Sequence, residues 1–160
     1  MNANSNKRNA KKRGTILVAD DDSAILVLIR TILTAAGHRV LLACDGDDAI
    51  RLVGQKHLSI DVALLDIHML GMRSSELANE IRSRRPKLPI LFMAGIVDDE
   101  IIRIRLLDGY AGFLPKPLQL DCLLRAVRQA MAASASGGGG ADGKRPFIAA
   151  EDGAFEGVAT

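Results

Sequence analysis

The sequence ILVADDDSAIL, at residues 16–26, sets three consecutive aspartates directly behind an apolar run. The residues before them are typical of a short buried strand, and from Ile25 onward apolar residues recur at helical spacing. Three adjacent carboxylates repel one another, and a buried one costs free energy unless it is paired. The stretch therefore predicts a strand, a charged turn and a helix, and the aspartates call for a functional explanation.

The same alternation continues along the chain. Strands are predicted over Thr15–Asp20, Arg39–Ala43, Asp61–Asp66, Leu88–Ala94 and Gly112–Pro115. Helices are predicted over Ala24–Ala36, from an N-cap at Asp45 to Val53, and over Ser75–Arg84, Asp98–Leu107 and Leu120–Met131. Apolar strands that alternate with amphipathic helices predict an α/β fold, a doubly wound five-stranded parallel sheet with helices on both faces.

The chain divides into one domain and two tails. Its 160 residues, 48% of them hydrophobic, are enough for one core. We expect residues 1–13 to form a disordered basic tail, residues 14–132 the domain, and residues 133–160 a Gly-rich flexible tail. The longest apolar run has six residues, whereas a membrane-spanning helix needs about 20. We expect no membrane association and no signal peptide, and therefore a cytoplasmic protein.

Charge and the cysteine and histidine positions exclude several classes of site. The net charge of +2 arises from five bases within residues 1–13, and the part between the tails carries about −1. This balance argues against DNA binding by the chain. The alternative is that residues 1–13 form a basic arm that binds nucleic acid. Cys44 and Cys122 have no metal-ligand spacing and are expected to be buried thiols. The three histidines, His38, His57 and His68, have no zinc or triad spacing and are expected to be exposed.

The predicted topology gathers charged residues at one edge of the sheet. Ligand sites of doubly wound sheets lie at the carboxyl ends of the strands, where this sequence places Asp20, Asp21, Asp22, Asp66, Ala94 and Lys116. Carboxylate oxygens without histidine or cysteine suit Mg²⁺. An aspartate such as Asp66 can act as a nucleophile toward phosphorus, with Lys116 as a point charge for the phosphoryl oxygens. For Asp22, helix capping and a supporting metal role have equal weight.

Four motifs carry a resemblance to a known family. The segments ILVADDDSAI, VALLDIHMLGM, PILFMAG and GFLPKP, in this order and spacing, resemble the receiver domain of bacterial two-component response regulators. The resemblance covers roughly residues 14–131. It implies a flavodoxin-like strand order, 2-1-3-4-5.

The resemblance also implies a phosphorelay function. The residue that matches Asp66 accepts a phosphoryl group from a histidine kinase or a histidine phosphotransfer protein. Lys116 matches the lysine that contacts the phosphate, and its peptide bond to Pro117 is expected to be cis. Such a domain catalyses at most its own phosphorylation and dephosphorylation, so we expect no other enzyme activity.

The resemblance further implies how Mg²⁺ is held. The positions of Asp20 and Asp21 match the family's acidic pair, in which Asp21 is expected to ligate the ion directly and Asp20 largely through water. Asp66 and the backbone carbonyl of His68 are the other expected ligands.

Several positions depart from the family pattern. Ala94 stands where a threonine or serine is usual, so the hydroxyl that normally links the phosphoryl group to a switch aromatic, here Phe113, is missing. Leu70 replaces the usual proline after the phosphorylation site. Arg73 stands where an acid is common, and Ser74 where glycine is common.

We expect a stand-alone receiver whose output is contact with a downstream protein or a homodimer. The last two helices and the fifth strand are the candidate face, with Arg103, Arg105, Arg125 and Arg128 on or near it. One alternative is a degenerate receiver, an interaction module that does not depend on phosphorylation because Ala94 lacks the hydroxyl. The other is a phosphatase like the haloacid dehalogenases, with Asp20 as nucleophile and Asp22 as acid/base.

Overall fold

The strands and helices alternate along the chain as predicted. A computed structural model describes residues 13–95, 112–135 and 147–148 of the chain. The described elements are β1 (Thr15–Ala19), α1 (Ser23–Ala35), β2 (Arg39–Ala43), α2 (Gly46–Gly54), β3 (Val62–Asp66), α3 (Ser74–Arg84), β4 (Ile90–Ala94), β5 (Gly112–Pro115), α5 (Leu120–Ala135) and β6 (Phe147–Ile148). The helix predicted over Asp98–Leu107 lies outside the described residues.

The sheet is parallel and has the strand order β2-β1-β3-β4-β5-β6. Its first five strands confirm the predicted order, 2-1-3-4-5. The sixth strand, β6, pairs with β5 through Gly112 and Phe113. It lies within residues 133–160, which the sequence predicted to be a flexible tail, so the sheet is one short strand wider than expected.

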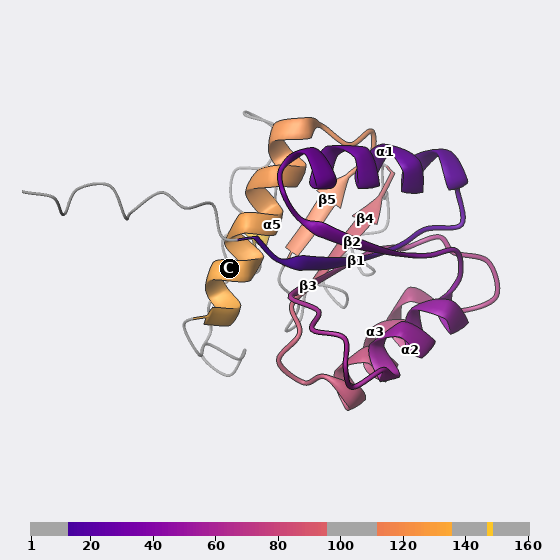
Figure 1. Cartoon of the computed structure of the whole chain (residues 1–160). Helices are drawn as coiled ribbons and strands as arrows, with labels where there is room; N and C mark the ends of the chain where they lie inside the picture. Colours follow the sequence, from indigo (N-terminus) through magenta and orange to yellow (C-terminus); the bar gives the residue numbers. More distant parts are fainter. Residues whose placement is uncertain (1–12, 96–111, 136–146, 149–160) are drawn as a thin grey trace, which may run out of the picture.

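Helices cover both faces of the sheet (Figure 1). One core lies between the sheet and α1 with α5, and the other lies between the sheet and α2 with α3. In β1, Ile16 and Val18 belong to the first core, whereas Leu17 and Ala19 belong to the second. Because successive side chains of a strand point to opposite faces, the unbroken apolar run Ile16–Ala19 in β1 is what a sheet covered on both sides requires.

Element boundaries differ from the prediction by a few residues. The last helix, α5, continues four residues past the predicted end, Met131, to Ala135. The added residues include three alanines, and alanine has the highest helix propensity. The glycines that follow from Gly137 favour the end of the helix.

Two expectations about burial were wrong. Cys44 is exposed, because it follows the last residue of β2, which lies at the edge of the sheet. His38 is 8% exposed rather than solvated, because its Nδ1 accepts a hydrogen bond from the Gly14 backbone at 3.2 Å. Cys122 is buried as predicted. Among the helices that the structure describes, none has the length and apolar character needed to cross a bilayer.

Candidate functional site

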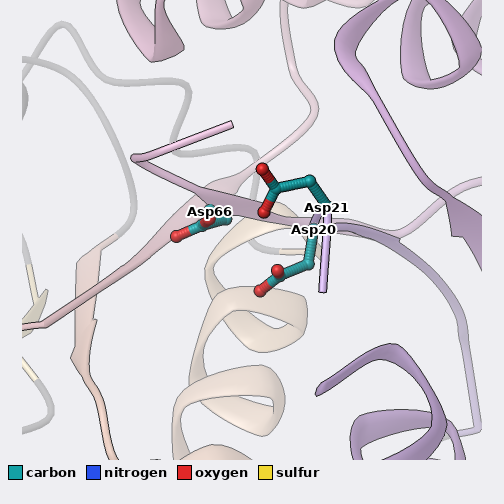
Figure 2. A group of neighbouring side chains, drawn as sticks. All are labelled: Asp20, Asp21 and Asp66. Atoms are coloured by element: carbon teal, nitrogen blue, oxygen red, sulfur yellow. The ribbon is translucent and has the colours of Figure 1, made fainter. Parts of the chain in front are cut away.

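Three carboxylates meet where β1 and β3 end. Asp20 and Asp21 follow β1, and Asp66 is the last residue of β3. The two strands are neighbours, with Ala19 in register with Leu65, so the positions that follow lie side by side. One carboxylate oxygen from each of the three aspartates lies within 4.8 Å of the others, and Figure 2 shows the three side chains grouped at these strand ends.

Lys116 joins this group from the end of β5. Its Nζ donates hydrogen bonds to Asp20 Oδ2 at 2.8 Å and to Asp66 Oδ1 at 3.1 Å. Its backbone N–H donates to the Ala94 carbonyl at 2.6 Å, and its peptide bond to Pro117 is cis, as expected. Burial alone would lower the pKa of Lys116, but the hydrogen bonds and charges of Asp20 and Asp66 outweigh it, so the pKa is raised. Lys116 is therefore a cation at neutral pH.

The charge and chemistry of the cluster fit a divalent cation. Asp20 is completely buried and Asp66 is 4% exposed, whereas Asp21 is open to solvent. Three carboxylates beside one ammonium leave an excess of negative charge in a partly desolvated place, which is costly unless a further cation offsets it. Oxygen ligands of this kind are those that Mg²⁺ prefers in proteins. Asp20, Asp21 and Asp66 are thus the residues that could hold magnesium.

Asp22 has a different role from its two neighbours. Its carboxylate accepts a hydrogen bond from the Ala24 backbone at 2.8 Å, and its backbone is extended, so it is the N-cap of α1. Its own N–H donates to Asp20 Oδ1 at 2.9 Å and helps to hold that side chain. Helix capping, one of the two roles weighed for Asp22, is confirmed.

The other predicted positions lie in β4, in β5 and in the turn after β3. Ala94 is fully buried at the end of β4, the strand between β3 and β5. Phe113 is half-buried in β5 and packs against the core on the α2 and α3 side. His68 lies in the turn two residues after Asp66, with an exposed side chain. A ligand role for its carbonyl stays a prediction.

One contact of the site, made by a backbone N–H, was not predicted from the sequence. The backbone N–H of Leu70 donates to Asp21 Oδ2 at 3.3 Å. A backbone donor has no side-chain signature in a sequence. The signal that could have revealed it is the replacement of the family's usual proline by Leu70, since proline has no N–H to donate.

Comparison with known proteins identifies the family. The profile described as "Response regulator receiver domain" matches residues 16–128. "Transcriptional regulatory protein AfsQ1" of Streptomyces coelicolor is 33% identical over 116 residues, which cover 71% of this chain and 50% of that protein. "DNA-binding transcriptional regulator NtrC" of Salmonella typhimurium is 31% identical over 120 residues, 75% of this chain and 25% of that protein.

A solved structure agrees with these sequence matches. The crystal structure of a response regulator receiver domain protein from Clostridium thermocellum superposes with a TM-score of 0.71 at 27% identity, covering 77% of this chain and 98% of that one. The chain spans half the length of AfsQ1 and a quarter of NtrC. The DNA binding in the name of NtrC conflicts with the expectation, drawn from charge, that DNA is no partner. The chain belongs to the response regulator receiver domain family.

Proposed function

We propose that this chain is a Mg²⁺-dependent phosphoacceptor of a two-component phosphorelay. Asp66 takes the phosphoryl group from a phosphohistidine of a histidine kinase or of a histidine phosphotransfer protein. The observation that carries this proposal is the buried Asp66 carboxylate, set beside Asp20 and Asp21 with the Lys116 ammonium 3.1 Å from its Oδ1. Membership of the response regulator receiver domain family also supports a phosphohistidine as the donor.

The transfer needs a nucleophile and compensation of charge. An Asp66 oxygen attacks phosphorus while the nitrogen–phosphorus bond of the donor breaks, and the bonding electron pair stays on the imidazole. The other imidazole nitrogen carries the proton that lets the ring leave neutral. Lys116 offsets the negative charge that gathers when a phosphoryl group approaches a carboxylate. Asp20, Asp21 and Asp66 would hold Mg²⁺, which supplies further neutralisation of the phosphoryl oxygens.

The first prediction tests the acceptor residue. Acetyl phosphate with Mg²⁺ should add one phosphoryl mass to the chain, measured by intact-mass spectrometry. Asp66→Asn removes the attacking oxygen anion and should abolish the gain. Asp47→Asn is the matched control, because Asp47 is an exposed carboxylate in the first turn of α2, outside the cluster. A gain that survives in Asp66→Asn, or no gain in the unaltered chain, would contradict the proposal.

The proposed output is protein contact. We infer that the phosphorylated domain, acting in the cytoplasm without any further enzyme activity, signals to a downstream protein or to a second copy. Arg125 and Arg128 of α5 are candidates for that face, whereas Arg103 and Arg105 lie outside the described residues. A stand-alone receiver stays a prediction, because the matched relatives are longer proteins.

Ala94 favours a second candidate, an interaction module that phosphorylation does not switch. Its fully buried methyl group, at the end of β4, offers no hydroxyl to a phosphoryl group on Asp66. Amide exchange across β4 and β5, compared before and after phosphorylation, separates the two functions. Changed protection supports the switched receiver, whereas a phosphoryl gain with unchanged protection supports the unswitched module. The phosphatase alternative has less support, because the carboxylate that it needs as acid/base, that of Asp22, caps α1.

A further inference from the structure

Leu70 has an exposed side chain and an engaged backbone. The residue is 82% exposed, so core packing does not explain its presence beside the acidic cluster. Its N–H, in contrast, donates to Asp21 Oδ2 at 3.3 Å. The next residue, Gly71, has a φ of 88°, a left-handed backbone that glycine adopts at little cost. The backbone of this turn is therefore the part that contacts the site.

Lys116 contacts two of the three aspartates, and the Leu70 N–H contacts the third. Lys116 Nζ lies between Asp20 and Asp66 and restrains both carboxylates. Asp21 is exposed, and its carboxylate oxygen lies within 4.8 Å of the oxygens of the other two. Electrostatic repulsion therefore favours rotation of Asp21 into solvent. The Leu70 N–H opposes this rotation, because it binds the carboxylate from the turn after β3.

We propose that the Leu70 amide is a positioning group that holds Asp21 toward the cation and thereby raises the affinity for Mg²⁺. This inference rests on the proposed metal site. It concerns Asp21, because among the described residues Lys116 binds the carboxylates of Asp20 and Asp66, whereas Asp21 accepts from the Leu70 N–H. A carboxylate offers about four lone-pair positions, so one donated hydrogen bond leaves the others for a cation. A proline at position 70 could not provide the bond.

Removal of this amide forms the second prediction. Leu70→Pro deletes the N–H, and Leu70→Ala keeps the N–H while removing most of the exposed side chain. Titration calorimetry with Mg²⁺ and no phosphodonor should show about three- to tenfold weaker binding for Leu70→Pro, as expected for losing one ordinary hydrogen bond at a solvent-exposed carboxylate. Leu70→Ala should bind as the unaltered chain does.

A second variant separates the amide from the shape of the proline ring. Proline also restricts the preceding residue, the buried Met69. Replacement of Leu70 by its α-hydroxy acid, introduced by nonsense suppression, changes the N–H to an ester oxygen and keeps the leucine side chain. We expect this ester to weaken Mg²⁺ binding as much as Leu70→Pro does.

The outcomes distinguish positioning from folding and from the metal site itself. Mg²⁺ should raise the thermal unfolding temperature less in the ester and Leu70→Pro chains than in the Leu70→Ala chain, because stabilisation by a ligand follows its affinity. If the Leu70 N–H had a purely structural role, the ester and Leu70→Pro chains would unfold at lower temperatures with and without Mg²⁺. The rise in unfolding temperature on adding Mg²⁺ would then be the same in all the chains. Equal Mg²⁺ affinity in all the chains would overturn the positioning role alone. No Mg²⁺ binding by the unaltered chain would overturn the proposed function as well.

Discussion

Lys116 is the side chain on which the charge balance of the acidic cluster depends. It reaches from the end of β5 to Asp20 and Asp66, which belong to the ends of two other strands. Asp20 is completely buried, and a buried carboxylate without a cation is far more costly than one in water. The same ammonium thus stabilises the fold and lies beside Asp66, the proposed site of phosphorylation.

The third prediction concerns this ammonium. Lys116→Met should lower the free energy of unfolding by about 1–3 kcal/mol, less than for a fully buried pair because the lysine is 22% exposed. Millimolar Mg²⁺ should reduce the loss, because the ion offsets the same carboxylates. Urea unfolding followed by circular dichroism, with and without chelator, measures both effects. Lys87→Met, at an exposed lysine, is the control; an equal loss there, or no recovery with Mg²⁺, would disprove this role.

At the scale of elements, two of the helices that follow strands begin at aspartate caps. The Asp22 carboxylate accepts from the Ala24 N–H at the start of α1, and the Asp45 carboxylate accepts from the Asp48 N–H at the start of α2. The first turn of a helix has unpaired N–H groups that such side chains satisfy. The run Asp20, Asp21 and Asp22 is therefore divided by the start of a helix into a site pair and a cap.

The fourth prediction follows from this division. Asp22→Ala should lower the free energy of unfolding by about 1 kcal/mol through loss of the cap, while Asp22→Ser, which can also cap, should lower it less. Neither variant should change the affinity for Mg²⁺ in titration calorimetry. Asp21→Ala should do the reverse, with weak Mg²⁺ binding and little loss of stability. Loss of Mg²⁺ binding in Asp22→Ser would show that Asp22 belongs to the metal site.

On the scale of the whole molecule, the two ends of the sheet carry different polar groups. The carboxyl ends of the strands hold the acidic cluster, whereas at the opposite end His38 and Asp61 hold the segment that enters β1. The Gly14 N–H donates to His38 Nδ1 at 3.2 Å, and the Thr15 N–H donates to Asp61 Oδ2 at 2.8 Å. Burial lowers the pKa of His38 from its ordinary value of 6.5, against a smaller opposing effect of the Asp61 charge.

The fifth prediction is the pH dependence that results. A base whose pKa is lower in the folded chain takes up its proton more readily when unfolded. The stabilising contribution of neutral His38 is therefore complete above about pH 6.5 and is lost as the pH falls toward the folded pKa. His38→Asn, which keeps an acceptor for Gly14, should flatten the fall in unfolding free energy as the pH decreases below about 6.5. His57→Asn, at an exposed histidine, should retain the slope; a slope unchanged in His38→Asn would rule out this origin.

The order of the elements and the members of the acidic cluster can be predicted from the amino-acid sequence. Apolar periodicity is local, so the five strands and the described helices were predicted to within a few residues. Because parallel strands bring their carboxyl ends to one edge, Asp20, Asp21, Asp66 and Lys116 could be placed together without coordinates. Neither the burial of His38 nor the pairing of β6 with β5 could be predicted in this way, because each depends on a partner remote in sequence.

The different roles of the three adjacent aspartates depend on the folded chain. Asp20 is buried against Lys116, Asp21 is exposed and accepts from the Leu70 N–H, and Asp22 caps α1. The partners of the first two lie 96 and 49 residues away. Adjacent aspartates have the same intrinsic chemistry, and their different roles arise from desolvation and from donors that folding brings to each carboxylate.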